Sequence, residues 1–577
     1  MEQFGSSELA ERRLATGDIP TDPAIAGISA ERLHRMVADL ASLGRKLPGS
    51  PEADQACAYI GEQLVECGLV PEVHLFDCFT SWPERCSVTI DGAAIAANGV
   101  AFSAATPAGG LTAPLVVMGQ GAEVKGAFVL VEGLPRYDSC IAAQRAGALG
   151  LIAVSHGSQR HYVQASPVWG SPTGPGDLAL LPTIPAVQVS RDDAAALRAA
   201  VAEGKPVTLS AEIHTEWRRA KLPVAEIPGR EPYYILLGAH YCTWRDGATD
   251  NTAGVALLME LARLFSQGPQ PRYGLKFAFW SGHEQGGYAG SSWYADRFQQ
   301  SLYDHAIAYL NVDIVGTRGG TTKALRNTTA ELNAYARRVL DATIGLQSAE
   351  EEAFVAQALK RADMYIDPRR SARNSDQSFS GIGLATAQVS AFLPAASPEH
   401  LPGSGLAWWW HTDHDTIERF DADILAVDTL IYRNLLAGLI EAEALPFDCE
   451  VMADDVLAGL RYYGETAPDL DELTDLGGLA ERLDAALGAL PEAARGDAGF
   501  LLRLGRHLNP ILYHARSDFE FDLGRASRIL PGLTPALTLA SLPPDEARMA
   551  RVVLRRRANR IAHGLSRAIE LVEAQGQ

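Results

Sequence analysis

Five carboxylate or imidazole side chains stand at the ends of predicted strands. His240 ends the run YILLGAH, Asp250 lies in GATDNTAG before a predicted helix, and Glu284 follows KFAFW. Asp313 ends a run in YLNVDIVG, and His411 opens HTDHDT after three consecutive Trp residues. Borderline divalent ions such as Zn²⁺ accept these ligands, and a bridging carboxylate would hold two ions about 3.5–4 Å apart. The pattern therefore predicts two divalent metal ions, expected to be Zn²⁺, that activate a water and polarise a carbonyl.

Alternating strands and helices are predicted to position these five side chains. From about residue 232, apolar strand-like runs at 233–238, 275–280 and 306–312 alternate with helix-like runs at 251–265 and 329–341. Such alternation indicates an α/β fold with a mainly parallel sheet covered by helices on both faces. Ligands of these sheets bind beyond the carboxyl ends of the strands, which is where the five side chains stand.

Three domains are expected, because 577 residues at roughly 150 per domain allow three or four. The α/β domain is discontinuous and spans residues 1–90 and 221–445. Residues 91–220, which we call the insert, hold short β runs rich in Gly, Pro and Ala, and predict a β-rich domain. Residues 446–577 predict an almost wholly helical domain, with breaks at prolines such as Pro510.

Two helices are predicted to lead into the α/β domain. The first covers 29–47 with Ser29 as its cap, and the second covers 51–67. A strand-like run follows at 70–79, and another at 207–213 closes the insert.

Charge and composition exclude several partner classes. Lys and Arg number 50 against 70 Asp and Glu, a net charge of −20, so neither nucleic acid nor an anionic membrane is an expected partner. No apolar run reaches the roughly 18 residues of a membrane span, and the N-terminus lacks the apolar stretch of a secretory signal. The seven cysteines are scattered and odd in number, which favours reduced thiols and a cytoplasmic location. The arginines from Arg548 to Arg567 indicate a solvated or dimer-facing helix.

The motifs resemble those of the M28 family of co-catalytic zinc exopeptidases. The likeness is specific in GAHY at His240, TDNTAG at Asp250, NVDIVG at Asp313 and HTDHDT at His411. The insert is similar to a protease-associated (PA) domain, which either shapes the cleft or is a plain structural insert. The combination with a C-terminal helical domain resembles the branch of glutamate carboxypeptidase II and transferrin receptor. This resemblance implies a homodimer formed through residues 446–577.

The resemblance also implies a role for each metal-type residue. Asp250 would bridge the two ions. His240 and Asp313 would complete one site, while His411 and a Glu from segment 283–285 would complete the other.

Four more residues are expected around the site. Asp376 matches a family position near the cleft, and Asp415 matches a carboxylate that could orient a ligand imidazole. Either could instead cap a turn or a helix. Tyr288 and Trp410 could line a substrate pocket, or could simply pack as aromatic side chains.

Cys242 departs from the family pattern. At the first ligand the family usually has the sequence His-x-Asp, in which the Asp supports the metal site. In this chain Cys242 stands at the position of that Asp. A thiol replaces a carboxylate poorly, and losses of this kind typically cost about 10–100-fold in metal affinity. Cys242 could also be a metal ligand, a nucleophile or an inert buried thiol.

The segment WSGHEQGGYAGS departs from the usual adjacent Glu-Glu pair, in which the first Glu is the general base and the second a ligand. Aligned from Trp280, His283 replaces the base and Glu284 remains the ligand. Aligned from the Gly-Ser that ends the segment, Glu284 remains the base and Gln285 replaces the ligand. We favour the first alignment because both metal sites then keep their ligands. His283 could act as a base near neutral pH, or could be an extra ligand, which would remove the base.

The sequence thus predicts a two-zinc amide or peptide hydrolase that releases an N-terminal amino acid or cleaves a small peptide-like substrate. One alternative is a non-catalytic homologue with a binding or structural role. Another is a different amide hydrolase, or a cyclase, on the same scaffold.

Overall fold

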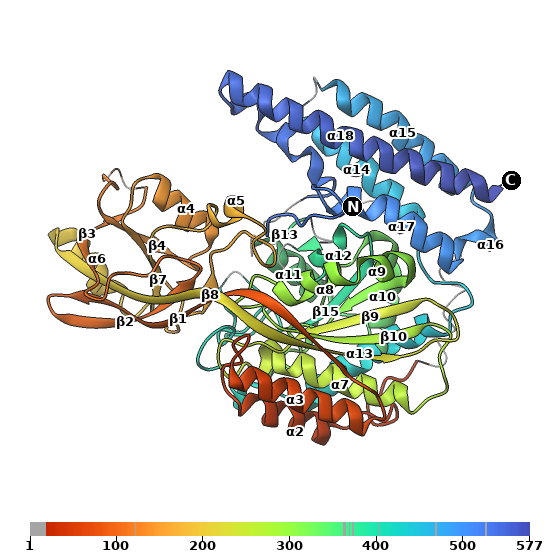
Figure 1. The fold of residues 1–577 in the computed structure, drawn as a ribbon, viewed down its shortest axis with the longest axis horizontal. Helices are drawn as coiled ribbons and strands as arrows, with labels where there is room; N and C mark the ends of the chain where they lie inside the picture. Colours follow the sequence, from red (N-terminus) through yellow and green to blue (C-terminus); the bar gives the residue numbers. More distant parts are fainter. Residues whose placement is uncertain are drawn as a thin grey trace.

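The structure is a computed structural model that describes residues 19–576 except 120, 122, 362–364, 368, 369, 372, 373, 403, 468, 469 and 525–527. Figure 1 shows a central α/β domain with the insert as a lobe on one side and the C-terminal helices, drawn in blue, as a further layer. The predicted α/β fold class is confirmed. No helix of the described part is long and apolar enough to span a membrane.

One hydrogen-bonded sheet of thirteen strands runs through the central domain and the insert. Its centre is four parallel strands, in the spatial order β10 (Gly274–Trp280), β9 (Tyr234–His240), β11 (Ala306–Asn311) and β15 (Ala385–Phe392). At the edges of this central set, β12 (Thr322–Arg326) and β8 (Pro206–Ile227) pair in the antiparallel sense. Because the four central strands point the same way, the segments that follow them gather at one end of the sheet.

Helices cover both faces of the central strands. On β9, Ile235 and Leu237 face one hydrophobic core, whereas Tyr234 and Leu236 face another, as the period of two requires. The first face is covered by α2 (Ala30–Ala41), α3 (Pro51–Glu66), α7 (Ala253–Ser266) and α13 (Ala422–Ile440), and the second by α8 (Ala289–Arg297) and α12 (Gln377–Ser380). The central strands are therefore buried on both sides.

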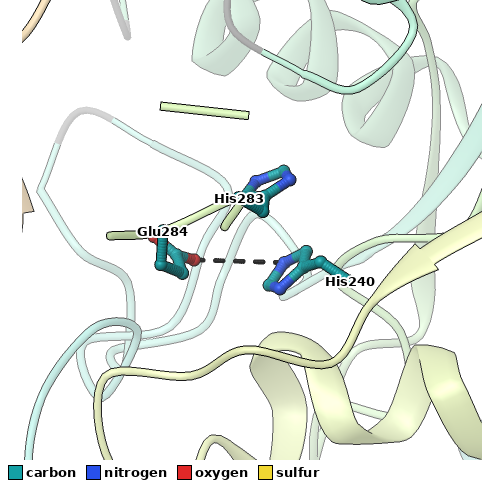
Figure 2. Close-up of side chains that lie close together, drawn as sticks. All are labelled: His240, His283 and Glu284. Atoms are coloured by element: carbon teal, nitrogen blue, oxygen red, sulfur yellow. Dashed lines mark ion pairs between the residues drawn. The ribbon is translucent and has the colours of Figure 1, made fainter. Parts of the chain in front are cut away.

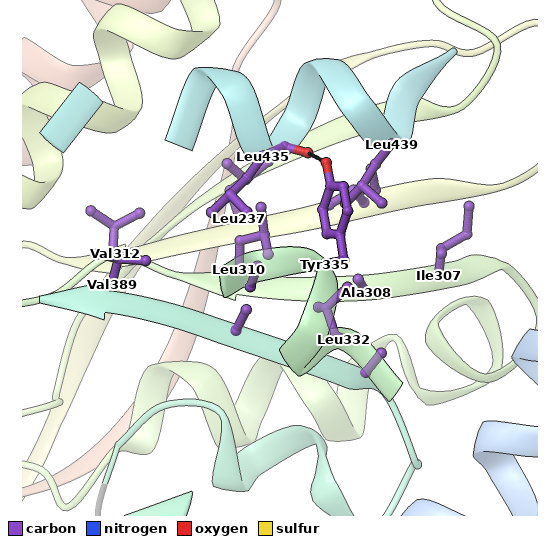
Figure 3. Packing of buried hydrophobic residues seen from close by; sticks show 14 of the residues in the cluster. Leu237, Ile307, Ala308, Leu310, Val312, Leu332, Tyr335, Val389, Leu435 and Leu439 are labelled. Atoms are coloured by element: carbon purple, nitrogen blue, oxygen red, sulfur yellow. Dashed lines mark hydrogen bonds between the residues drawn. The ribbon is translucent and has the colours of Figure 1, made fainter. Parts of the chain in front are cut away.

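The larger core joins the sheet to the helices. Figure 3 shows Leu237 and Leu310 of the sheet beside Tyr335 of α10 (Ala330–Ile344) and Leu435 of α13. The Tyr335 hydroxyl donates to the Leu435 carbonyl at 2.6 Å, so this buried phenol does not lose its hydrogen bond. The core fixes the strands whose ends carry the site.

The long strands β1 (Glu72–Ile90) and β8 pair along most of their lengths and run from the central domain into the insert (Figure 1). The runs predicted at 70–79 and 207–213 are parts of these longer strands. The predicted boundary after residue 220 falls inside β8.

The insert is β-rich, as predicted, and also holds short helices. Its strands are β2 (Ala93–Ala101), β3 (Leu111–Val117), β4 (Phe128–Glu132), β5 (Gly150–Val154), β6 (Val163–Gln164) and β7 (Ala186–Val189). Helices α4 (Tyr137–Arg145), α5 (Pro175–Leu178) and α6 (Ala194–Glu203) lie between or after them. The pairs β3–β4, β4–β5 and β5–β7 are parallel, and parallel pairs need crossover connections of this kind.

The C-terminal region is helical as predicted, with α14 (Glu450–Thr466), α15 (Asp471–Gly488), α17 (Ala498–Tyr513) and α18 (Pro544–Glu573). The break expected at Pro510 is wrong, because Pro510 lies inside α17. Leu508 and Leu512 on either side are fully buried, and this packing outweighs the local cost of proline near the end of the helix.

Helix α2 ends earlier than the predicted 29–47. Ser29 caps it as expected, accepting from the Arg32 N–H at 3.2 Å. At its end the chain turns, and the buried Lys46 ammonium donates to the carbonyls of Leu40 at 3.2 Å and Gly44 at 2.8 Å. Lys46 therefore satisfies carbonyls that a longer helix would have used itself.

The buried Lys46 predicts a pH dependence of stability. Burial lowers its pKa from the ordinary 10.5 to about 7, although Asp246 and Asp415 oppose the shift. Above pH 7 the folded chain releases this proton while the unfolded chain keeps it to about pH 10.5, so raising the pH favours the folded state. Between pH 7 and pH 9 we expect the free energy of unfolding to rise by about 2 kcal/mol more in the wild type than in Lys46→Met.

Urea unfolding followed by circular dichroism at both pH values measures this difference. A Lys46→Met variant with the pH dependence of the wild type would contradict the assignment.

Candidate metal centre and active site

The five predicted metal-type side chains converge at the carboxyl ends of the central strands. His240 is the last residue of β9, Glu284 follows β10, and Asp313 follows β11. Asp250 lies just before α7, and His411 comes from the loop that precedes α13. All five are nearly or fully buried, because the helices and loops around the strand ends enclose them.

Two groups of ligand atoms share Asp250. The first group is His240, Asp250 and Asp313, and the second group is Asp250, Glu284 and His411. In the first, His240 Nε2 lies 3.1 Å from Asp250 Oδ1 and 3.4 Å from Asp313 Oδ1. In the second, His411 Nε2 lies 3.1 Å from both Asp250 Oδ2 and Glu284 Oε1. Asp250 thus presents one oxygen to each group, as a bridging carboxylate would.

The first group fits a cation. His240 Nε2, Asp250 Oδ1 and Asp313 Oδ1 are buried and have no hydrogen-bond partner among the described residues. These three atoms lie close together, but their relative orientations do not allow hydrogen bonds between them. Leaving such atoms unpaired is costly, and a divalent ion between them would satisfy all three.

The charges of the second group also fit a cation. Burial alone would lower the pKa of His411, but the charge of Glu284 and the contact with Asp250 raise it to about 10. In the absence of a metal, a protonated imidazole therefore balances the buried carboxylates. A divalent ion would take over that role and displace the proton.

The backbone of Cys242 supports the first ligand. His240 Nδ1–H donates to the Cys242 carbonyl at 2.9 Å, which leaves Nε2 facing Asp250 and Asp313. The thiol accepts instead from the His283 N–H at 3.2 Å. The Cys242 carbonyl thus sets the imidazole tautomer at the position where the family uses a carboxylate.

Asp415 holds a turn of the site, which is the second of the two roles that the sequence left open. It accepts from the Thr249 N–H at 3.0 Å and hydroxyl at 2.7 Å, and from the Asp250 N–H at 3.0 Å. Burial raises its pKa to about 6, although the bonds from Thr249 oppose this. Asp415 therefore holds the backbone of the shared ligand, since both of its oxygens accept from the turn at 249–250.

The arrangement of segment 283–285 agrees with the first alignment. Glu284 turns its carboxylate toward His411, whereas the buried Gln285 donates through Nε2 to the Thr243 carbonyl at 2.9 Å. Gln285 belongs to no candidate metal group of the described residues. Glu284, and not Gln285, therefore stands with the candidate metal ligands.

His283 lies directly beside the ligands, as Figure 2 shows with His240 and Glu284. Its ring stacks on that of His240, with centroids 3.9 Å apart, and its Nδ1 lies 3.1 Å from Ser375 Oγ. The dashed line marks the 3.9 Å separation of His240 and Glu284. These three residues form a further candidate ligand group, so both the base and the ligand interpretations of His283 stay geometrically open.

A pocket opens over the cluster. Tyr288 and Trp410 line it as predicted. Asp376 does not: it is fully buried and accepts from Asn327 Nδ2 at 2.8 Å, while its neighbour Asn374 reaches the pocket. Asn374, two residues before Asp376, therefore faces the cavity in its place.

Two arginines of the pocket were missed by the sequence reasoning. Arg136 comes from the insert and Arg326 from the end of β12. Arg326 is 5% exposed, and its Nε has no hydrogen-bond partner among the described residues. Arg326 ends β12, but neither arginine belongs to a motif with metal-ligand spacing, so no sequence signal pointed to them.

The fold and the cluster define an α/β protein with a candidate two-metal centre. Residues 224–434 match peptidase family M28, and residues 94–197 match the PA domain. Residues 224–434 are therefore similar to an M28 peptidase domain and residues 94–197 to a PA domain, in agreement with the sequence motifs.

Curated relatives match parts of the chain. Aminopeptidase YwaD of Bacillus subtilis is 26% identical over 291 residues, which are 48% of this chain and 59% of that protein. Probable glutamate carboxypeptidase VP8 of Zea mays is 24% identical over 389 residues, 52% of this chain and 53% of that protein. The chain therefore spans little more than half the length of these relatives.

A solved structure supports the fold. BSAP, a zinc aminopeptidase from Bacillus subtilis, has a TM-score of 0.54 and 19% identity, covering 74% of this chain and 97% of that chain.

Proposed function

We propose that this protein is a metal-dependent, two-zinc amide or peptide hydrolase that acts as an aminopeptidase on small peptides. One observation carries the proposal: two buried ligand groups share Asp250, and the first contains three polar atoms without hydrogen-bond partners among the described residues. The likeness to aminopeptidase YwaD and the match to peptidase family M28 support it. A non-catalytic role is not favoured, because both groups keep carboxylate and imidazole ligands.

Two divalent ions held by the first and second groups would activate a water and polarise the scissile carbonyl. His283 is placed to handle the proton. If its Nδ1–H donates to Ser375 Oγ, its Nε2 carries the lone pair and can accept a proton from the attacking water. Stacking on His240 and an edge contact with Tyr288 hold the ring in place. The same Nε2 can then return the proton to the leaving amine.

The arginines suggest a second candidate substrate class. Arg136 and Arg326 bring positive charge to a pocket whose cluster is acidic, and guanidinium groups recognise carboxylates well. Substrates that carry a free carboxylate, such as dipeptides, would use these residues, whereas aminoacyl-anilides would not.

Metal analysis and a substrate panel test the proposal. We expect two Zn²⁺ per chain after gentle purification, loss of turnover on chelation, and recovery when Zn²⁺ is restored. Dipeptides and aminoacyl-anilides assayed side by side separate the two substrate classes. Less than one ion per chain would contradict the enzyme proposal, and uniform inactivity with two bound ions would favour a different amide hydrolase or a cyclase.

We also propose a cytoplasmic location and a homodimer formed through residues 446–577. All seven cysteines are free thiols, which suits a reducing compartment. On α18, Met549 and Val552 are 63% and 53% exposed, which suits contact with a second copy. Light scattering should give twice the chain mass of 61.8 kDa, and cell fractionation tests the location. A mass of one chain would contradict the dimer.

A further inference from the structure

The insert contacts one metal-type residue directly. The Tyr162 N–H donates to the His411 carbonyl at 2.7 Å, and the His411 Nδ1–H donates back to the Tyr162 carbonyl at 2.7 Å. The adjacent His161 Nδ1–H donates to the Trp410 carbonyl, also at 2.7 Å. His411 has a φ of 58°, in the left-handed region that non-glycine residues seldom adopt. Its conformation therefore depends on the insert that holds it.

The same part of the insert also supports Glu284. The Trp244 indole N–H donates to Glu284 Oε2 at 2.8 Å, which leaves Oε1 directed at His411. The Trp244 ring stacks on Tyr162 of the insert, with centroids 5.7 Å apart and planes 15° from parallel. Arg245 Nε donates to the Tyr162 hydroxyl at 2.9 Å, which fixes the ring of Tyr162 against Trp244. Both rings are buried, so the stack cannot move without undocking the insert.

Among the described residues, no residue of the insert hydrogen-bonds to His240 or Asp313 of the first group. Within that part of the chain, the insert reaches His240 only through ring contacts, from Trp169 to Tyr288, His283 and then His240. His240 is held by the Cys242 carbonyl, and the Asp313 carbonyl accepts from Gln388 and Ser390. These partners all come from the central domain. The direct hydrogen bonds from the insert to a ligand therefore go to the second group, through His411, and not to His240 or Asp313.

From this asymmetry we propose that Tyr162 and Trp244 are positioning residues of the second group, so that metal binding there depends on the docked insert. Metal binding by the first group does not depend on it. Imidazole and carboxylate ligands need fixed orientations, and losing the partners that fix them typically weakens a metal site by about 10–100-fold. The proposal rests on the proposed two-metal function, and it makes the insert part of the metal centre as well as of the pocket.

Zinc titration of the metal-stripped full chain tests the proposal by calorimetry. The wild type should show two binding events. In Tyr162→Ala and in Trp244→Phe, one event should weaken by about 10–100-fold while the other keeps its affinity. Trp244→Phe keeps a buried aromatic ring and removes the indole N–H, so it stays informative if Tyr162→Ala fails to fold.

Trp169→Phe is the matched control. Trp169 is also a buried tryptophan at the interface of the insert, but its indole N–H donates to Ser378 Oγ at 2.9 Å and not to a ligand. This variant should keep both zinc affinities. The proposal is overturned if Trp244→Phe leaves both events unchanged, weakens both equally, or behaves like Trp169→Phe. Fewer than two events in the wild type would overturn the two-metal function itself, before any variant is compared.

Discussion

Replacing His283 with alanine is expected to lower kcat by about 10²–10⁴-fold while both metal ions stay bound. The pocket over the cluster includes His283, whose imidazole lies beside the ligands without belonging to the first or second group. Imidazole is the side chain that most readily takes up and releases a proton near neutral pH. Glu284 faces His411, and Gln285 cannot act as a base.

His283→Glu distinguishes the loss of a proton-accepting group from the loss of packing by the imidazole ring. A carboxylate at this position can accept the proton, so His283→Glu should recover at least about tenfold of the activity that His283→Ala loses. Steady-state kinetics and the metal content of each variant measure the effect. Loss of a metal ion in His283→Ala would instead indicate that His283 is a ligand, as its candidate metal group with His240 and Glu284 allows. Normal turnover in His283→Ala would return the role of base to Glu284.

The positions of the ligands could be predicted because they follow directly from the fold. Parallel strands bring their carboxyl ends together, so His240 at the end of β9 and Asp313 just after β11 had to be neighbours. The strand patterns were strong because the central strands are buried on both faces and read as continuous apolar runs. Helical spacing and caps likewise predicted the two helices that lead into the domain, although α2 ends earlier than predicted.

The supporting contacts could not be predicted, because they use backbone groups and distant segments. His240 donates to the Cys242 carbonyl, a backbone group whose role no side-chain pattern in the sequence reveals. Tyr162 and His411 are hydrogen-bonded although they lie 249 residues apart in the sequence, so no motif with a fixed spacing could link them. Asp415 was placed near the site correctly, but its two oxygens hold a turn that only the three-dimensional structure defines.

Replacing Asp250 with asparagine is expected to have the largest effect of any single change at the site. Asp250 alone belongs to both the first and the second group, with one oxygen facing each imidazole. Removing its charge weakens both groups together, so the purified variant should hold less than one metal ion per chain. Metal ions supply several kcal/mol of transition-state stabilisation, so turnover should fall by at least about 10³-fold.

Asp313→Asn is the matched control, because it removes the same charge from the first group only. It should keep about one ion per chain, since the second group retains Asp250, Glu284 and His411. Both substitutions preserve the shape of the side chain. The hydrogen bond from the backbone N–H of residue 250 to Asp415 also remains in place. Metal content after dialysis against metal-free buffer separates the outcomes. Two bound ions in Asp250→Asn would contradict a shared bridging ligand, and equal losses in both variants would mean that the two groups bind metal as one unit.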